Sequence, residues 1–254
     1  MKRLQDKVIV IAGGTKGVGR AAAEEFAREG AKVVIGDLDE EAALKSIRLM
    51  RTLGSDGIFV YTDLRDVKYC KNLFDRAYDS FGRIDGFFMY SGVTPVSPLD
   101  TCDEATYDWV MDVNLKGCFF CCQHAIRYMR MSGGGSIVFT GSAHGWGGQK
   151  DRAAYACSKG GLRILMEHIA HQYASEHIRC NYFTLGWTPT DGEVSLRLSL
   201  GESEAELRKR AASILPMGRM CEYADYLDGL VYLMSDGSSM MTGSVFRITG
   251  GEFI

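Results

Sequence analysis

The chain alternates short runs of β-branched and aromatic residues with longer segments in which apolar residues recur every three or four positions. A short apolar run closed by glycine or aspartate is typical of a buried strand, and the longer period is typical of an amphipathic helix. Strands are predicted at residues 7–14, 31–39, 56–66, 84–92, 133–143, 178–186 and 244–250. Helices are predicted at residues 17–30, 40–54, 67–82, 103–131, 152–175, 195–215 and 222–235.

This alternation of strand and helix predicts an α/β fold built on a doubly wound parallel sheet with helices on both faces. No repeat, low-complexity tract or linker interrupts it, so residues 1–254 are expected to form a single domain. In such folds a ligand binds in the crevice at the carboxyl ends of the strands. Small or polar residues stand at those ends, namely Gly13, Asp37, Asp63, Gly92, Ser142 and Gly186.

Composition narrows the classes of partner. The formal net charge is -3 and the pI is about 6.0, which gives no electrostatic case for a nucleic-acid partner. No apolar run approaches the length of a membrane span. The eight cysteines are scattered, without a signal-peptide pattern or zinc-like spacing, so we expect reduced thiols in a cytoplasmic protein and no metal site. The group at residues 118–122 is expected to pack in the core.

A glycine-rich turn joins the first strand to the first helix. It reads AGGTKGVG, and its spacing is Gly-x3-Gly-x-Gly rather than the commoner G-x-G-x-x-G. Glycines let the backbone bend and let a phosphate approach the helix N-terminus, where free N–H groups favour negative charge. The turn therefore predicts a dinucleotide site, provided the next strand agrees. Its candidate residues are Gly13, Thr15, Lys16, Gly17, Val18 and Gly19.

Asp37 supplies that agreement. It closes the second strand 18 residues after Gly19, where a carboxylate can accept both ribose hydroxyls of an adenosine. A 2'-phosphate would be repelled there, so Asp37 favours NAD over NADP. The alternative for Asp37 is a cap on the helix that follows. Lys16 could assist NADP, but a flexible surface lysine is compatible with either cofactor.

Tyr155 and Lys159 form the central chemical motif. They stand four apart in a predicted helix, so both side chains project from one face, and the ammonium can stabilise a phenolate. A Tyr-x3-Lys pair alone is usually only an exposed helix pair. Its surroundings decide between the two interpretations.

Those surroundings resemble the short-chain dehydrogenase/reductase family over nearly the whole chain. The resemblance rests on AGGTKGVG, TDL at 62–64, Asn114 in VNLKG, Ser142, the Tyr155–Lys159 pair and LGWTPT at 185–190. It implies a Rossmann-type domain that catalyses NAD(P)-dependent hydride transfer between carbinol and carbonyl. By that resemblance Tyr155 is the acid/base, Ser142 binds the substrate oxygen, Lys159 holds the ribose and Asn114 supports a proton-relay water.

The resemblance also implies further cofactor contacts and a substrate lid near residues 187–215. Beside Asp37, Tyr155 and Lys159, these contacts are Leu38, Asp63, Leu64, Ser91, Gly92, Gly186, Thr188 and Thr190. Three departures from the family pattern stand out. The segment 89–92 reads Met-Tyr-Ser-Gly where Asn-Asn-Ala-Gly is usual, Leu185 replaces a proline, and Ala12 replaces a threonine.

The substrate is less determined. The resemblance places Ser142, His144, Gln149, Tyr155 and Trp187 around it, with Trp146, Glu193 and Thr94 nearby. Their polar groups and tryptophans favour a sugar or polyol, with a hydroxysteroid as the alternative and acyl-carrier ketoreduction third. A different class, a non-catalytic NAD-binding sensor or structural subunit, is favoured only by the altered segment at 89–91.

Assembly is the last expectation. Helices 103–131 and 152–175 carry apolar residues that exceed what one sheet face needs, and similar proteins pair these helices across a two-fold axis. The residues are Val110, Val113, Cys118, Phe119, Leu162, Leu165 and Ile169. We expect a homotetramer, or at least a homodimer; the alternative is that these residues all pack inward.

Overall fold

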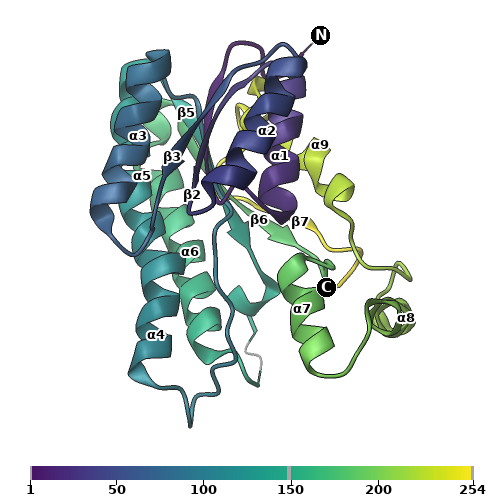
Figure 1. Ribbon diagram of the computed structural model, residues 1–254. Helices are drawn as coiled ribbons and strands as arrows, with labels where there is room; N and C mark the ends of the chain where they lie inside the picture. Colours follow the sequence, from purple (N-terminus) through teal and green to yellow (C-terminus); the bar gives the residue numbers. More distant parts are fainter. Residues whose placement is uncertain (1, 148–149, 253–254) are drawn as a thin grey trace.

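The computed structural model describes residues 2–147 and 150–252 and shows a single parallel sheet flanked by helices (Figure 1). The strand order β3-β2-β1-β4-β5-β6-β7 confirms the predicted doubly wound sheet. The strands are β1 (Val8–Ala12), β2 (Lys32–Asp37), β3 (Gly57–Tyr61), β4 (Gly86–Met89), β5 (Gly135–Gly141), β6 (Ile178–Leu185) and β7 (Val245–Ile248).

Alternate residues of the central strand β1 serve the two faces of the sheet. Val8 and Val10 belong to one buried cluster, and Ile9 and Ile11 belong to the other. The first cluster includes residues of α3, α5 and α6, and the second includes residues of α1, α2 and α9. The main helices are α1 (Gly17–Arg28), α2 (Glu40–Thr52), α3 (Val67–Phe81), α4 (Glu104–Met111), α5 (Gly117–Ser132), α6 (Ala153–Gln172), α7 (Asp191–Ser199), α8 (Glu204–Ile214) and α9 (Tyr223–Met234). Because β1 is covered on both faces, it is apolar at every position.

The predicted helix at 103–131 is not regular. A π-helical turn, η1 (Asp112–Lys116), separates α4 from α5, and it contains Asn114. Such turns occur singly within α-helices and often mark functional positions. The apolar period of the sequence passes through this turn without a visible break.

The predicted helical run at 195–215 is interrupted as well. Gly201 adopts a left-handed φ of 81°, and Ser203 starts α8 with a capping box to Glu206. Helices α7 and α8 lie beyond the carboxyl edge of the sheet, on the β6 and β7 side (Figure 1). Helix α8 and the segment after it form a small core of Leu207, Ala211, Leu215 and Met220, with Trp187 packed against it.

The prediction that the two long helices carry more apolar surface than the core can cover is largely wrong. Val110, Cys118, Leu162 and Ile169 are at most 2% exposed within the single chain, because they pack into the core. Val113 and Leu165 are partly buried against the same core. Phe119 is 49% exposed and is joined on the surface by Tyr107, Trp109 and Ile164.

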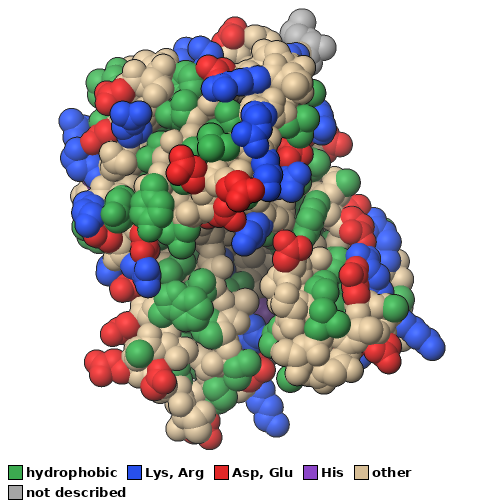
Figure 2. Space-filling model, in the orientation of Figure 1, with side chains coloured by type: hydrophobic (Ala, Val, Ile, Leu, Met, Phe, Trp, Pro, Cys, Tyr) green, Lys and Arg blue, Asp and Glu red, His purple; other side chains and the backbone are tan. Residues whose placement is uncertain are grey.

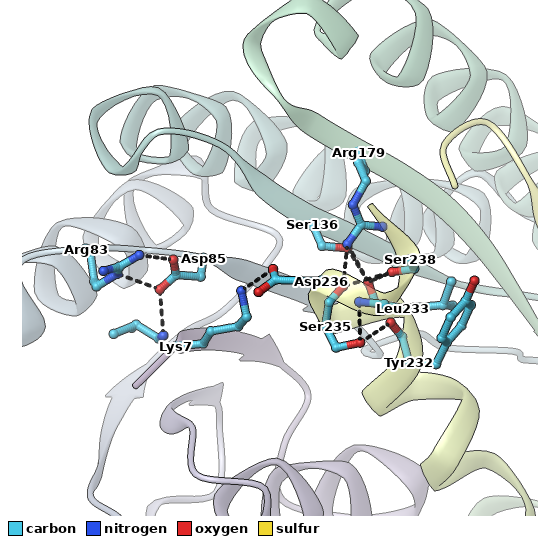
Figure 3. Close-up of polar contacts among 12 residues, drawn as sticks. Lys7, Arg83, Asp85, Ser136, Arg179, Tyr232, Leu233, Ser235, Asp236 and Ser238 are labelled. Carbon is cyan, nitrogen blue, oxygen red and sulfur yellow. Dashed lines mark hydrogen bonds and ion pairs between the residues drawn. The ribbon is translucent and has the colours of Figure 1, made fainter. Parts of the chain in front are cut away.

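The amino ends of the strands surround a cavity of about 470 Å³. Figure 3 shows its polar side chains, which come from segments far apart in the sequence. Arg179 donates to the carbonyl oxygens of Met241, Leu233 and Ser235, at 3.2, 2.9 and 3.2 Å. The last two lie at the C-terminal end of α9, where free carbonyls need donors. Arg179 therefore completes the end of that helix.

Two ion pairs lie at the same edge (Figure 3). Lys7 Nζ is 2.7 Å from the Asp236 carboxylate, and Arg83 makes two bonds to Asp85, at 2.8 and 2.6 Å. Asp85 also accepts the backbone N–H of Val8 at 2.9 Å, which joins β1 to the residue before β4.

The eight cysteines are all free, and the group at 118–122 is buried in the core as predicted. Over residues 2–147 and 150–252, no helix combines the length and the apolar character needed to cross a membrane.

Candidate active site

A second cavity, of about 720 Å³, lies at the carboxyl ends of the strands. Figure 2 shows a hollow between the main body and the α7–α8 region, with basic side chains and a histidine on its walls. The cavity brings together most of the predicted site residues: Gly13, Thr15, Lys16, Asp37, Leu38, Ser91, Gly92, Ser142, His144, Tyr155, Lys159, Gly186, Trp187, Thr188 and Thr190. Residues separated by more than 170 positions therefore meet in one space.

Tyr155 and Lys159 project into this cavity from α6. The Lys159 ammonium lies 5.6 Å from the centroid of the Tyr155 ring and is 3% exposed. It donates to the carbonyl oxygen of Thr140, on β5, at 2.8 Å. This bond fixes the lysine between strand and helix and leaves two of its three N–H donors for other partners.

Tyr182 ties Ser142 to the same helix. Its hydroxyl accepts the backbone N–H of Ser142 at 3.1 Å and donates to the carbonyl oxygen of Lys159 at 3.2 Å. The ring lies so close to β5 that a Cβ on Gly141 would come within 2.1 Å of it. Burial raises the pKa of Tyr182, so the hydroxyl stays neutral and keeps the proton that it donates.

The Ser142 hydroxyl is held by His144. It accepts the backbone N–H of His144 at 3.2 Å and lies 2.8 Å from ring Nδ1. When Nδ1 carries the proton, Ser142 accepts both bonds and its own O–H is directed elsewhere. The His144 ring also stands edge-on to Tyr155, with centroids 5.7 Å apart. The three side chains thus form one polar group at the floor of the cavity.

Asn114 acts from the buried side of this group. Its amide accepts the N–H of Val93 at 2.8 Å and donates to the carbonyl of Val93 at 2.9 Å. The same Nδ2 donates to Ser158 Oγ at 3.1 Å, and Ser158 donates to the carbonyl of Tyr155 at 2.7 Å. The side chain is fully buried. Asn114 therefore links the loop after β4 to the backbone of the helix that carries Tyr155.

Tyr90 stands beneath the glycine-rich turn, where the sequence departs from the family pattern. Its hydroxyl accepts the N–H of Val18 at 3.3 Å, in the first turn of α1. A Cβ on Gly17 or on Gly19 would approach the Tyr90 side chain to 2.5 Å. Burial raises the pKa of Tyr90 to about 12, so its proton remains available as a donor. The tyrosine fills space that the glycines leave open.

Asp37 faces the turn rather than the following helix. Its Oδ2 accepts the N–H and the hydroxyl of Thr15, at 3.1 and 2.6 Å, and Oδ1 accepts the N–H of Leu38 at 2.7 Å. The cap of α2 is Asp39, which accepts the N–H of Ala42 at 3.0 Å. The capping alternative for Asp37 is therefore wrong. Oδ1 accepts only one bond and so retains a lone pair, and Asp37 lines the cavity.

Comparison with known proteins decides the family. A family model described as Enoyl-(Acyl carrier protein) reductase matches residues 12–252. The chain is 32% identical over 247 residues to cis-4-hydroxycyclohexanecarboxylate dehydrogenase of Sinomonas cyclohexanicum, covering 97% of this chain and 96% of that one. It is 32% identical to L-rhamnose 1-dehydrogenase (NAD(P)(+)) of Azotobacter vinelandii over 257 residues, 99% of this chain and 98% of the other.

The chain belongs to the short-chain dehydrogenase/reductase family. A further relative, 7alpha-hydroxysteroid dehydrogenase of Clostridium sardiniense, is 30% identical over 254 residues, 99% of this chain and 95% of the relative. The solved structure of levodione reductase superposes with a TM-score of 0.92 at 28% identity, covering 98% of both chains. The family and its named members identify this chain as an NAD(P)-dependent alcohol dehydrogenase/reductase.

The residues present fit the nicotinamide dinucleotide that short-chain dehydrogenases use. The cavity extends from the glycine-rich turn and Asp37 to Tyr155 and Ser142, so the two ends of an extended cofactor have separate walls. The turn is closely packed, because a Cβ on Gly19 would lie 1.9 Å from the carbonyl oxygen of Gly13. Only glycine permits that approach.

Five predicted cofactor residues do not line the cavity: Gly17, Val18, Gly19, Asp63 and Leu64. Asp63 instead binds Arg65 through both carboxylate oxygens, and this pairing lowers the pKa of Asp63. Leu64 is 5% exposed and belongs to the core. The family pattern therefore predicts cofactor contacts for Asp63 and Leu64, but in this chain their side chains contact other residues.

The α7–α8 region covers the substrate side through Trp187. Its indole N–H donates to Glu193 at 2.9 Å, and the guanidinium groups of Arg210 and Arg197 lie 4.8 and 5.8 Å from its ring. Arg197 bonds Glu193 at 2.8 Å, and Arg210 bonds both oxygens of Glu202. The predicted lid is therefore held in place by charged pairs around one tryptophan.

Of the other residues predicted near the substrate, Thr94 and Glu193 line the cavity, and the predicted cofactor residue Thr190 lines it too. Trp146 does not line the cavity; its ring packs edge-on against Tyr182 and beneath the guanidinium of Arg247. Gln149 lies outside the described residues. Thr190 lines the cavity, and its hydroxyl also caps α7 by accepting the N–H of Glu193 at 3.2 Å.

Sequence reasoning missed several charged residues of the cavity wall, among them Arg152 and Glu252. Arg152 is the N-cap residue of α6 and stands three positions before Tyr155, and this nearness in the sequence is a signal that could have revealed it. Glu252 accepts the backbone N–H of Trp187 at 2.8 Å from the end of the chain, and no local pattern indicates this contact. Burial raises the pKa of Glu252, although the Trp187 N–H partly opposes the shift. Over the described ranges 2–147 and 150–252, no acidic, histidine or cysteine cluster suits a metal ion.

Proposed function

We propose that this enzyme interconverts a secondary alcohol and a ketone on a small, hydroxylated, ring-sized substrate, with NAD as its preferred cofactor. The observation that carries the proposal is the shared cavity, in which Ser142, Tyr155 and Lys159 face the same space as Asp37. When bound, a nicotinamide dinucleotide supplies the hydride acceptor or donor. The proton chemistry belongs to the protein.

Tyr155 is the proposed acid/base. In the oxidising direction its hydroxyl oxygen takes the proton of the substrate carbinol, and in the reducing direction it returns a proton to the developing alkoxide. Ser142 donates its O–H to the same substrate oxygen, with His144 holding the hydroxyl in place. Lys159, buried beside the Tyr155 ring, favours negative charge on the phenol oxygen.

Lys159 and Asn114 also have proposed positioning roles. The two N–H donors that Lys159 does not spend on Thr140 are free to bind ribose hydroxyls. Asn114 holds the loop after β4 against α6 through Ser158, and so sets the position of Tyr155 along the cavity. These bonds support a positioning role for the Asn114 side chain; the proton-relay water remains an expectation of the family resemblance.

Asp37 supports the choice of NAD. Oδ1 accepts one bond from the protein and retains capacity for a ribose hydroxyl, whereas a 2'-phosphate would meet the charge of the carboxylate. Lys16 lines the cavity as well and is exposed, so it could serve a phosphate only after Asp37 is removed.

The polar character of the substrate side favours a small hydroxylated ring, such as a sugar, polyol or hydroxylated alicyclic compound, over a steroid. Glu193, Arg197, Arg210 and Glu252 line that side, and a steroid's large apolar surface would desolvate them. The intact Ser142, His144 and Tyr155 group argues against a non-catalytic NAD-binding role.

The test is turnover with purified enzyme, followed by NADH absorbance, against a panel of sugars, polyols, cyclohexanols and hydroxysteroids with NAD and NADP in parallel. We expect activity on at least one small cyclic alcohol, with NAD preferred by about 100-fold or more, which corresponds to ~3 kcal/mol. Activity on hydroxysteroids alone would overturn the substrate class, and a preference for NADP would overturn the cofactor assignment.

The proposal also places this enzyme in the cytoplasm as a homotetramer or homodimer. The eight free thiols support a reducing compartment, and the exposed Tyr107, Trp109, Phe119 and Ile164 offer apolar surface on α4, α5 and α6 for a partner copy. Light scattering that gives a 28.0 kDa particle at micromolar concentration would contradict the assembly.

A further inference from the structure

Three arginines line the active-site cavity, and one of them differs from the others in its partners. Arg197 and Arg210 each form a hydrogen-bonded pair with a glutamate. Arg152 forms no such pair with any described residue. Its nearest carboxylate is that of Asp151, 3.8 Å from Nε and 48% exposed, which is too far for a hydrogen bond.

Arg152 is nevertheless held rigidly. Both N–H groups of Nη1 are used by Thr94, at 2.7 Å to its carbonyl and 2.6 Å to its hydroxyl. The side chain is only 13% exposed. Within the described part of the chain, neither Nε nor Nη2 has a hydrogen-bond acceptor, and Nε is buried. A guanidinium has five N–H donors, so three of the five remain unused.

A largely buried cation without a bonded anion is costly, because desolvation is not compensated. A ligand anion can supply the missing partner, and a guanidinium whose orientation is already fixed loses little entropy in binding it. A carboxylate can accept from Nη2, whose N–H groups have no acceptor among the described residues.

The position of Arg152 sets where such an anion would lie relative to the reacting carbon. Arg152 is the N-cap residue of α6, directly before its first helical residue, and both Arg152 and Tyr155 line the cavity. A substrate whose carbinol reaches Tyr155 can therefore place a carboxylate at Arg152 across a six-membered ring.

The acidic residues of the cavity do not oppose this placement. Arg152 contacts the loop that follows β4, whereas Glu252 follows β7 and contacts Trp187, which follows β6. The strand order puts β5 and β6 between β4 and β7, so Arg152 and Glu252 contact loops that follow different strands. Glu193 is already paired with Arg197.

We propose that the substrate of this enzyme is a hydroxy acid, and that Arg152 binds its carboxylate while Tyr155 and Ser142 bind its carbinol. This inference rests on the proposed function, because it assigns the substrate class of the same site. Arg152 is a specificity-determining residue here, and the bond to Thr94 is what holds its guanidinium for the substrate.

The first experiment measures binding and does not depend on turnover. Cyclohexanecarboxylate and cyclohexanecarboxamide, which share shape but differ in charge, are titrated into the enzyme–NADH complex by calorimetry. We expect the carboxylate to bind about 10- to 100-fold more tightly, as a hydrogen-bonded charge pair requires. Equal affinity, tighter binding of the amide, or no measurable binding of the acid would each overturn the proposal.

Matched variants locate the effect. Arg152→Gln should remove the preference for the acid, while Arg163→Gln should keep it, because Arg163 stands on the same helix outside the cavity. Thr94→Ala retains the arginine but loses one of its two acceptors, so a smaller, partial loss of preference is expected. If Arg152→Gln lowers binding of acid and amide equally, its role is structural and the proposal fails.

Turnover measurements then test the proposed reaction separately from the proposed carboxylate binding by Arg152. An enzyme that oxidises cyclohexanol with NAD but shows no preference for 4-hydroxycyclohexanecarboxylate over its amide retains the proposed function and loses this inference. An enzyme that binds cyclohexanecarboxylate through Arg152 but oxidises no secondary alcohol keeps the inference about the site and loses the proposed reaction.

Discussion

Two cavities lie at opposite edges of one parallel sheet, and both are lined by charged side chains. At the amino edge each basic group has its partners within the chain: Lys7 pairs with Asp236, Arg83 with Asp85, and Arg179 with backbone carbonyls (Figure 3). Lys7 and Arg179 thereby connect segments that lie far apart in the sequence. These charged groups bind other parts of the chain and so stabilise the fold.

At the carboxyl edge Arg197 and Arg210 are paired with glutamates, but three other charged groups keep unused bonding capacity. Lys159 uses one donor on Thr140, Arg152 uses only Nη1, and Glu252 accepts a single backbone N–H. Each is placed by one contact and retains capacity for another. The two cavities do not differ in having charged walls. They differ in how many hydrogen-bonding positions of the charged side chains remain unused, and unused positions indicate a binding site.

The strongest test of this contrast is Tyr155→Phe. We expect turnover to fall by about 1,000-fold, because the proton carrier is lost, while NADH affinity stays within a few-fold of the native value. Steady-state kinetics and NADH fluorescence titration measure the two quantities. Residual activity above about a tenth of native would remove Tyr155 from the chemical step. Lys159→Ala serves as the comparison, since it should weaken both rate and cofactor binding.

Asp37→Ala probes the cofactor end of the same cavity. Removing the carboxylate should lower kcat/KM for NAD and raise it for NADP, changing their ratio by about 100-fold, or ~3 kcal/mol. Adding Lys16→Ala should abolish the gain in NADP activity, because the lysine is then the residue that binds the 2'-phosphate. An unchanged ratio in the single variant would mean that Asp37 serves only to hold Thr15.

Arg179→Met tests the amino edge, where we expect the reverse pattern. The carbonyls of Leu233 and Ser235 lose a donor, so the free energy of unfolding should fall by about 2 kcal/mol. Urea denaturation measures this loss, and kcat well below the melting temperature should stay near native. A variant that is as stable as native but inactive would show that the amino-edge cavity has a catalytic role.

Glu252→Gln tests whether the charge of this carboxyl-edge residue costs stability, through the dependence of unfolding on pH. Burial raises the pKa of Glu252 above its ordinary value near 4.5, so the folded state holds the proton more tightly than the unfolded state. Its charge therefore costs stability as pH rises through the folded pKa, and the cost is absent below the unfolded value. Thermal unfolding should show the variant matching native at about pH 4 and exceeding it at about pH 7. A variant that is less stable at neutral pH would mean that the bond from Trp187 requires the charge.

Much of this arrangement is readable in the sequence. The strand and helix periods predict the sheet, and the Tyr155–Lys159 spacing predicts a shared face because both follow from local geometry. What the sequence hides is contact between distant segments. The hydroxyl of Tyr182 between Ser142 and Lys159, or Glu252 beneath Trp187, has no local pattern.

Local chemistry also leaves a choice open where two residues compete for one role. Asp37 and Asp39 both precede α2, and only the backbone geometry shows that Asp39 is the cap. The apolar faces of the long helices predict a partner surface, yet Val110 and Leu162 are consumed by the core, because helical period reports amphipathicity but not how far a core extends.

The π turn at Asp112–Lys116 gives the chain an unusual sensitivity to length. Such a turn accommodates one residue more than a regular α-helix would, and each α-helical residue advances the chain by about 100°. Deleting one residue here would let the hydrogen bonds close in regular α-helical register, so the change would fall mainly within the turn that holds Asn114 and not on the relative phase of α4 and α5. Asn114 would turn away from Val93 and Ser158. Along this helix the spacing of residues is therefore under tighter constraint than the identity of most of them, and an engineer could exchange exposed side chains freely while being unable to shorten the segment.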